Sequence, residues 1–468
     1  MADIADTGEA LPDPREPKAN QLSRRRLLQG GAALAAAGLT SPWWASQAGA
    51  ATTGPSNSFG PFSTRRSVKK TTLTLMTWEL YEPTEIGAWK TIVSEFEAAN
   101  PSISVKWTGW PFATYDQEVA AQAQAGHISA DVVMCPPELS STLINIYGMC
   151  EPIGEIAHEV GLVPAVQTKQ FAVNGKLYAL GILTVAFVLE YDRALLASAG
   201  YNSPPTTPDE WLAYSEKLTA PSKHQYASWL TSQASSGANM WIALQNFPLG
   251  WGGAWAKGKT LTIDSPECIA AMEMWVKLVK ASGLAGTSYA TQQKLWYNGQ
   301  IAMLVSVALG ASTVKAAAPK LWPNLRTAAL PWANKKAIER LHTINILKSS
   351  KNQAAAHELV KWIVTPKHLW YIDHTNGYPL VPYSNFADVV PQYEPFLKSL
   401  PWNTGFTQSD YVGEYNVLGD YVFAYSEIGN IVDSQIVRAL SGSVTVKEAL
   451  QAAQAQAQAS LHIPTPAG

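Results

Sequence analysis

Residues 78–81 place aromatic rings beside a carboxylate. Trp78, Glu79 and Tyr81 directly follow residues 72–77, an alternating run that predicts a β-strand. A tryptophan ring can pack on the C–H face of a flat, amphipathic ligand, and a neighbouring carboxylate can accept hydrogen bonds from hydroxyl groups. This chemistry suits a sugar. The alternative is that Trp78 belongs to the core and Glu79 is a solvated charge.

Two later segments offer similar groups. Glu138 follows a short buried strand expected at residues 131–134. It can accept hydroxyl protons, or it can begin a helix, where an acidic residue favours the positive dipole end. Trp251 precedes Gly252 and Gly253, which would let backbone N–H groups approach a ligand. A plain turn is the alternative there.

Two further candidates stand at the ends of other elements. Ser306 follows the strand-like residues 301–305. Tyr378 follows an Asn-Gly turn signal at residues 376–377, so it could line a cleft or pack at a hinge.

No catalytic or metal-binding pattern stands out. The chain has no G-x-S-x-G, H-E-x-x-H, P-loop or G-x-G-x-x-G motif followed by a helix. His368 and His374 are six residues apart, which does not place two ligands on one helix face. The three cysteines have no metal spacing, so Cys135 and Cys150 either form a disulfide or stay reduced. We expect no catalytic residues, no metal and no cofactor.

The elements that position these residues alternate between strand-like and helix-like runs, which predicts an α/β fold. Apolar residues recur at three- and four-residue spacing in residues 86–100, and Asn100-Pro101 ends that helix. Thr207 and Glu210 flank a helix start. Other expected strands and helices lie at residues 103–107, 115–125, 131–134, 266–282, 353–364 and 449–459.

Composition indicates a globular chain with a large core. Of 468 residues, 47% are hydrophobic and only 15% are charged, which is unlike a disordered chain. The 34 basic and 36 acidic residues leave a net charge of −2, so no basic excess exists to neutralise nucleic-acid phosphates. Eighteen tryptophans exceed what an ordinary core needs, and part of that surplus can line a ligand surface.

The N-terminus has the layout of an export signal. Three arginines at positions 24–26 precede a short Ala- and Gly-rich apolar run, and small residues follow up to Ala50. The arginines with this mild apolar run resemble a twin-arginine signal. We expect residues 1–50 to be a signal peptide and residues 51–70 a flexible tether. An amphipathic N-terminal helix is the alternative.

Several short motifs in the first half of the mature chain carry a family resemblance. Residues 96–105 (FEAANPSISV) resemble the pattern F-E-x-x-x-P-x-I-x-V, and residues 125–133 (AGHISADVV) resemble A-G-x-x-P-D-V-V. Residues 175–180 (GKLYAL) match G-K-L-Y-G-L. Residues 190–196 (EYDRALL) stand where Y-Y-N-K-x-L-F is expected. Residues 205–211 (PTTPDEW) resemble P-P-x-T-W-D-E-L.

The second half continues the same order. Residues 251–253 (WGG) lead into residues 261–267 (LTIDSPE), residues 297–303 (YNGQIAM) resemble F-x-x-G-K-A-A-M, and residues 441–450 (SGSVTVKEAL) resemble a closing G-x-x-T-V-E-E-A-L. Together these motifs resemble the extracellular solute-binding proteins of ABC importers, in the branch that includes sugar- and maltose-binding proteins.

The resemblance implies a two-lobed periplasmic-binding-protein fold (type II) of α/β class, with discontinuous lobes joined by crossing hinge strands. It places residues 71–183 and 327–378 in the first lobe. It places residues 184–326 and 379–468 in the second. Solute would then bind between the lobes, where Thr184 is the one polar residue of an otherwise apolar run.

The resemblance also implies a function. The chain would be a periplasmic or extracellular monomer that captures a small solute, most often a carbohydrate, and delivers it to the membrane subunits of an ABC permease. The expected ligand-binding residues are Trp78, Glu79, Tyr81, Glu138, Thr184, Trp251, Gly252, Gly253, Ser306 and Tyr378. Two alternatives remain, a secreted sugar-processing enzyme and a receptor that feeds a sensor.

Overall fold

The computed structural model describes residues 70–83, 85–233, 238–307, 314–315, 317–378, 381–400, 412–414 and 416–461. The chain divides into a unit of residues 1–66 and a unit of residues 67–468, and all described residues lie in the second. The expected signal peptide and most of the expected tether lie outside the described residues.

One mixed sheet contains nine strands in the order β2-β1-β3-β12-β6-β10-β7, with β11 beside β6 and β13 beside β12. The strands are β1 (Thr71–Met76), β2 (Ile103–Thr108), β3 (Val132–Cys135), β6 (Leu180–Asp192), β7 (Tyr226–Trp229), β10 (Ile301–Val307), β11 (Leu325–Ala328), β12 (Lys336–Ile346) and β13 (Val412–Glu414). Two hairpins add β4 (Ala172–Val173) with β5 (Lys176–Leu177), and β8 (Ala256–Lys257) with β9 (Thr260–Leu261).

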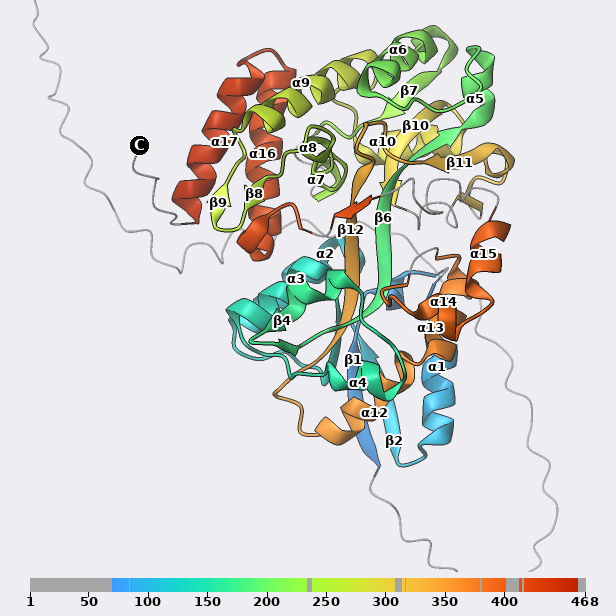
Figure 1. The fold of residues 1–468 in the computed structure, drawn as a ribbon, viewed down its shortest axis with the longest axis vertical. Helices are drawn as coiled ribbons and strands as arrows, with labels where there is room; N and C mark the ends of the chain where they lie inside the picture. The colour runs from blue at the N-terminus through green and yellow to red at the C-terminus, as the bar shows by residue number, and fades with distance from the viewer. Residues whose placement is uncertain are drawn as a thin grey trace, which may run out of the picture. The chain divides into compact units, whose positions relative to one another are not determined.

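The long strands β6 and β12 connect the two halves of this sheet. The first half contains β1, β2 and β3, the second contains β7, β10 and β11, and the same names are used for the parts of the molecule that pack around them. Strands β6 and β12 pair antiparallel with each other from Leu180 to Ala186 of β6. Beyond that stretch β6 pairs with β10 and β11, whereas the far end of β12 pairs with β3. Figure 1 shows both strands running side by side from one half into the other.

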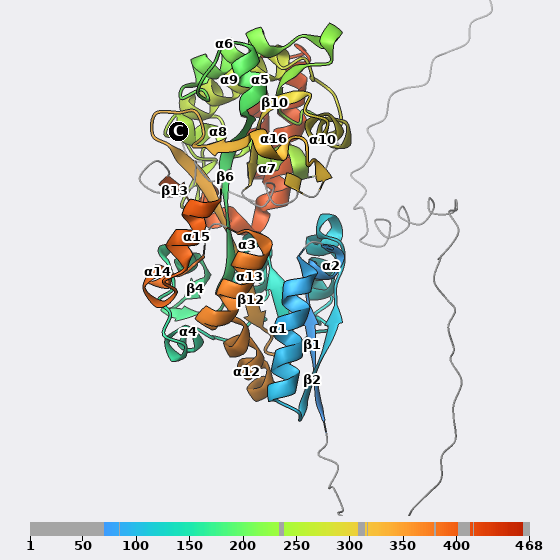
Figure 2. The same ribbon diagram turned by 90° about the vertical axis from the view of Figure 1, so that its right-hand side faces the viewer.

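The helices pack on both halves of the sheet. They are α1 (Ile86–Ala99), α2 (Phe112–Gln124), α3 (Pro137–Ser141), α4 (Glu155–Glu159), α5 (Arg193–Ser198), α6 (Pro208–Leu218), α7 (Ala238–Leu244), α8 (Phe247–Gly250), α9 (Pro266–Ala281), α10 (Tyr289–Tyr297), α12 (Gln353–Ile363), α13 (Pro366–Asn376), α14 (Phe386–Val389), α15 (Tyr393–Ser399), α16 (Tyr425–Leu440) and α17 (Val446–Ser460). Short helical turns are η1 (Glu79–Tyr81), η2 (Thr142–Ile146), η3 (Val166–Phe171), η4 (Pro221–Lys223), η6 (Trp322–Asn324) and η7 (Gly419–Ala424). Figure 2 shows α1, α12 and α13 beside one another against the first half of the sheet.

Local sequence explains these elements well. Helix α1 buries Trp89, Ile92 and Phe96, the face expected from its apolar spacing. Helix α6 begins where expected, because the Thr207 side chain accepts a hydrogen bond from the Glu210 backbone N–H. The strands and helices expected from the sequence are confirmed to within a few residues.

The buried side chains form two large clusters and a smaller third one. The first cluster gathers around β1, β3 and α1, and the second around α9 and α16. Along β6, alternate residues point to opposite faces, so Phe187 and Leu189 join the second cluster while Ala186 and Val188 join the third. The second half of the sheet is therefore covered on both faces.

The buried clusters divide the chain differently from the lobe boundaries expected from the sequence. Leu330 and Trp332 lie in the second cluster, although residues 327–378 were expected in the first lobe. The reason is that β11 pairs with β6, so this part of the chain crosses to the first half only after Trp332, along β12. Tyr383 and Phe386 lie in the first cluster, although residues 379–468 were expected in the second lobe.

Cys135, Cys150 and Cys268 are free and buried, so the structure does not form the Cys135–Cys150 disulfide. Among the described residues, no helix is both long enough and apolar enough to cross a membrane.

Candidate functional site

A cavity of about 280 Å³ opens between α2 and the second half of the sheet; we call it the aromatic pocket. Helix α2 belongs to the first half, since its Tyr115 and Val119 lie in the first cluster, and it contributes Phe112 to the wall. Most of the other lining side chains come from β6, β7, α7, α10 and β10, and Thr231 and Val314 lie outside these elements. Six rings line the pocket: Phe112, Phe187, Trp229, Tyr289, Trp296 and Tyr297.

The rings of this pocket are held by neighbouring groups. The Trp229 and Tyr289 rings meet edge to face, with centroids 5.0 Å apart. The Trp229 indole N–H donates to the Thr231 hydroxyl over 3.1 Å. Ring faces fixed in this way can pack against the flat side of a solute.

Among the described lining residues, Glu190 supplies the one carboxyl group. It is only 1% exposed, and its Oε1 atom has no hydrogen-bond partner in the structure. Burial raises the pKa of Glu190 to about 8, and a hydrogen bond with Ser306 partly opposes that rise. This carboxyl group is therefore mostly protonated at neutral pH.

Phe112, which the first half contributes to the pocket wall, packs against other aromatic side chains. Phe112 stacks on the His342 ring with centroids 6.2 Å apart, and Trp78 meets the Phe112 ring edge-on at 5.6 Å. Burial, with the charge of Arg340 beside it, lowers the pKa of His342 to about 3, so the imidazole is neutral. Phe112 itself remains 37% exposed, which leaves its outer face free for contact.

A second cavity of about 280 Å³ lies further along α2; we call it the acidic pocket. Asp116 and Glu138 line it from the first half, and Phe423, Tyr425 and Glu427 line it from the second. Burial is the main cause that raises the pKa of Asp116 to about 8. Both pockets are thus walled by α2 on one side and by second-half elements on the other.

The structure places the residues predicted near position 78 away from the aromatic pocket. Trp78 is buried and packs against Tyr115 as well as Phe112, the position that the alternative interpretation of this residue describes. Glu79 is buried, and burial followed by the charge of Glu85 raises its pKa well above the ordinary value. Tyr81 is exposed, and its hydroxyl donates to the backbone oxygen of Gly109 over 3.2 Å.

Tyr378 is fully buried and donates a hydrogen bond to the Glu85 carboxylate. Thr184 is buried in the paired stretch of β6, opposite Leu341. Of the ten predicted residues, Ser306 lines the aromatic pocket and Glu138 lines the acidic pocket. The structure does not bring the other eight into either cavity.

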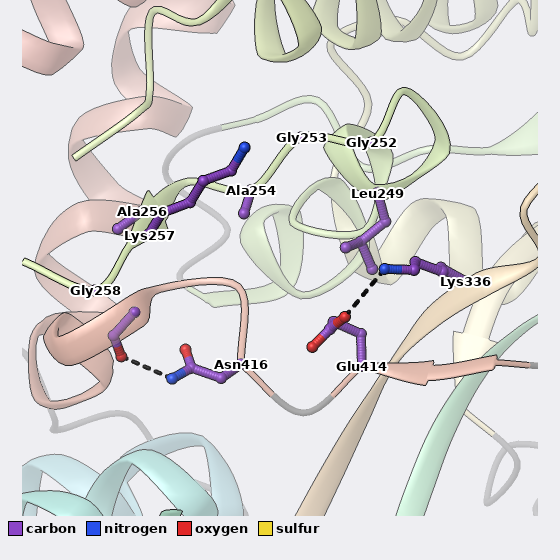
Figure 3. Close-up of a pocket in the computed structure, with 11 residues that line it drawn as sticks. Leu249, Gly252, Gly253, Ala254, Ala256, Lys257, Gly258, Lys336, Glu414 and Asn416 are labelled. Carbon is purple, nitrogen blue, oxygen red and sulfur yellow. Dashed lines mark hydrogen bonds and ion pairs between the residues drawn. The ribbon is translucent and has the colours of Figure 1, made fainter. Parts of the chain in front are cut away.

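Gly252 and Gly253 line a third cavity of about 360 Å³, together with Lys257, Lys336 and Glu414 (Figure 3). Gly252 has a φ of 74°, which favours glycine. The backbone N–H groups of both glycines already donate to carbonyls of α8, and an ion pair of 3.4 Å joins Lys336 to Glu414. Trp251 does not line this cavity and instead packs near Trp332.

Sequence reasoning missed Phe112, Glu190, Trp229 and Tyr289. For Glu190 a signal was present, because it is a single carboxylate near the end of the apolar run 180–192, in a strand buried on both faces. The three aromatic residues had no such signal, since rings at strand and helix ends occur as often in cores.

Groups of three or more His, Cys, Asp or Glu side chains with metal-binding geometry are absent from the described part of the chain. The aromatic and acidic pockets offer ring faces, hydroxyls, amides and carboxyl groups. These groups suit reversible binding of an organic solute.

Solved structures share this fold at low identity. A solute-binding protein of an ABC transporter from Thermotoga lettingae, bound with α-D-tagatose, is 20% identical with a TM-score of 0.70, covering 84% of this chain and 100% of that one. The GacH receptor of Streptomyces glaucescens, solved unliganded and with acarbose, is 19% identical with a TM-score of 0.71, covering 85% and 100%. Maltose-bound MalE3 of T. maritima is 18% identical with a TM-score of 0.66, covering 83% and 100%.

No curated protein matches the chain. The model of one family, the bacterial extracellular solute-binding proteins, matches residues 82–368, which is more than half of the 468 residues. The solved structures show the two-lobed α/β fold of periplasmic binding proteins. The chain belongs to the family of bacterial extracellular solute-binding proteins.

Proposed function

We propose that this protein is the solute-binding component of an ABC importer, which captures a sugar or oligosaccharide between its lobes and delivers it to a membrane permease. The family match supports solute binding. Structures with the same fold support the solute class, since they were solved with tagatose, acarbose and maltose.

The observation that supports this proposal best is that both halves of the molecule contribute side chains to the wall of the aromatic pocket. Phe112 comes from the first half of the molecule, whereas Trp229 and Tyr289 come from the second. A solute held between them contacts both halves only when they are close together. Binding therefore favours the closed arrangement, which a permease can recognise.

The pocket also has the chemistry of a carbohydrate site. Its rings can stack on the C–H faces of a sugar, and Thr231, Gln293 and Ser306 offer hydrogen bonds to hydroxyl groups. We propose that Ser306 in the aromatic pocket and Glu138 in the acidic pocket are the predicted residues that contact solute. Trp78 packs against the Phe112 ring and holds it in position in the pocket wall.

We further propose that the protein acts as an exported monomer without catalytic activity, and that residues 24–26 direct it to the twin-arginine route. Changing all three arginines to lysine should then retain the protein in the cytoplasm. Secretion of this variant would contradict the proposed route while leaving the binding function unaffected.

A thermal-shift screen tests the function. Tagatose, maltose, acarbose and a set of other sugars and polyols are added to the purified protein, and a solute bound only by the folded state raises the melting temperature. Each hit is then incubated with the protein and analysed by chromatography for conversion. A rise in melting temperature without conversion supports a binding protein. Conversion, or no stabilisation by any carbohydrate, contradicts the proposal.

A further inference from the structure

The position of Glu190 is not explained by a site for neutral carbohydrate alone. Its carboxyl group is almost completely buried among the residues that line an aromatic pocket, and its Oε1 atom has no hydrogen-bond partner. Among the described residues that line the pocket there is no lysine, arginine or histidine. The pocket therefore presents an acid and several rings, with no basic side chain to balance the acid.

We propose that the aromatic pocket takes a positively charged amine group of the solute, held by the Glu190 carboxylate and by the ring faces of Trp229, Tyr289 and Tyr297. This inference rests on the proposed function and narrows its solute class to amine-bearing compounds, such as an amino sugar or an amino polyol.

The surroundings of Glu190 favour a cation over other groups. An anion would lie against the carboxyl group with no basic side chain to compensate. A neutral hydroxyl would gain one ordinary hydrogen bond. An ammonium group gains a charge-assisted hydrogen bond, which is about twice as strong, and attraction to the ring faces besides.

The same geometry predicts a proton exchange on binding. Burial raises the pKa of Glu190 to about 8, so the free pocket holds a mostly neutral carboxyl group at pH 7. A bound cation favours the carboxylate, so binding expels the proton. Affinity for a permanently charged ligand must then rise as the pH increases from 6 to 8, and level off above the pKa.

The other titratable groups that face this carboxyl group are the phenols of Tyr289 and Tyr297 on α10. Burial raises both of their pKa values above the ordinary one, so both stay neutral over this pH range. From β7, β10 and α7 the lining residues present no ionisable group. Asp116 on α2 and Asp433 on α16, both outside the pocket, also have pKa values raised to about 8, so loss of the pH dependence in Glu190→Gln is what assigns it to Glu190.

Two charged and neutral probe pairs test the inference on the full chain. Choline is compared with its neutral isostere 3,3-dimethylbutan-1-ol, and glucamine with sorbitol, by isothermal titration and by tryptophan fluorescence. We expect each cation to bind at least 10-fold more tightly than its neutral partner at pH 8. Choline should bind several-fold more weakly at pH 6, and at pH 7 it should release protons in buffers of different ionisation enthalpy.

Two variants separate the role of Glu190 from general effects of burial. Glu190→Gln keeps the shape of the side chain but removes its charge. The ratio of the affinity for the cation to that for its neutral partner should therefore fall to about one, and the proton release on binding should vanish. Asp433→Asn is the matched control, because this α16 carboxyl group is also buried with its pKa raised to about 8, yet it lies outside the pocket. Asp433→Asn should retain both the preference for the cation and the release of a proton on binding.

Equal binding of charged and neutral probes, failure of both cations to bind, or an unchanged preference in Glu190→Gln overturns the inference. If neutral sugars stabilise the protein in the thermal screen while no cation is preferred, the proposed function stands and only this inference fails. If neither sugars nor amines bind, both fail.

Discussion

The guanidinium group of Arg340, on the connecting strand β12, forms an ion pair with the Glu138 carboxylate at the start of α3, and both side chains are nearly fully buried. The same guanidinium lies over the Tyr425 ring of α16, 5.2 Å from its centroid. Arg340 therefore links a residue that follows β3 of the first half to a helix of the second. The pair lies beside the acidic pocket.

Breaking this ion pair should strongly destabilise the protein. Glu138→Gln leaves a buried guanidinium without its charged partner, and such losses cost about 3–5 kcal/mol. Urea unfolding measures the change. The control is Glu394→Gln, which removes the exposed pair with Lys398 and should cost less than about 1 kcal/mol. Equal small effects at both positions would show that the buried pair is not important for stability.

Phe112→Ala should weaken solute binding more than about 10-fold, because the variant removes the ring with which the first half closes the aromatic pocket. The melting temperature of the free protein should change little, since the ring is 37% exposed. Titration with the best carbohydrate from the thermal screen provides the affinity. Tyr371→Ala removes an aromatic side chain that is 39% exposed on α13, and it should bind normally. Normal binding by Phe112→Ala would exclude this pocket as the solute site.

Trp78→Ala should mainly destabilise the fold. The indole is 4% exposed and packs against Tyr115 and His342, so its removal leaves a cavity that costs about 3–5 kcal/mol. The unfolding free energy in urea tests this. If the variant unfolds normally but binds poorly, Trp78 contacts the solute directly, contrary to its position in the structure.

Asp433 should make stability fall as the pH rises. Burial raises its folded-state pKa from 3.8 to about 8, so between these values the folded protein holds a proton that the unfolded chain has released. Stability contributed by this group is complete below pH 3.8 and is lost as the pH rises towards 8. Asp433→Asn should remove a slope of up to about 1.4 kcal/mol per pH unit from the stability curve. An identical slope in both proteins, measured by urea unfolding from pH 4 to 8, would contradict the assignment.

Solute binding should make the protein more compact, because a ligand between α2 and α10 contacts both halves only when they approach each other. Small-angle scattering with and without a carbohydrate from the screen measures the radius of gyration. Phe112→Ala at the same solute concentration serves as the control. An unchanged radius in the wild-type protein would argue against closure while leaving binding intact.

The sequence by itself determined the α/β class and most individual elements. Periodic apolar residues placed α1, and Thr207 with Glu210 placed the start of α6, because both signals act within a few residues. The ordered series of short motifs also pointed to the solute-binding family, which the match over residues 82–368 shows.

Only the tertiary structure decided which residues share a cavity. Phe112 and Tyr289 are 177 residues apart in sequence, and they line one cavity because β6 and β12 connect the two halves. Trp78 and Phe112 are both aromatic residues near element ends, yet one is core and the other lines the pocket. Burial depends on which other segments pack against a residue, and no local pattern encodes those distant contacts.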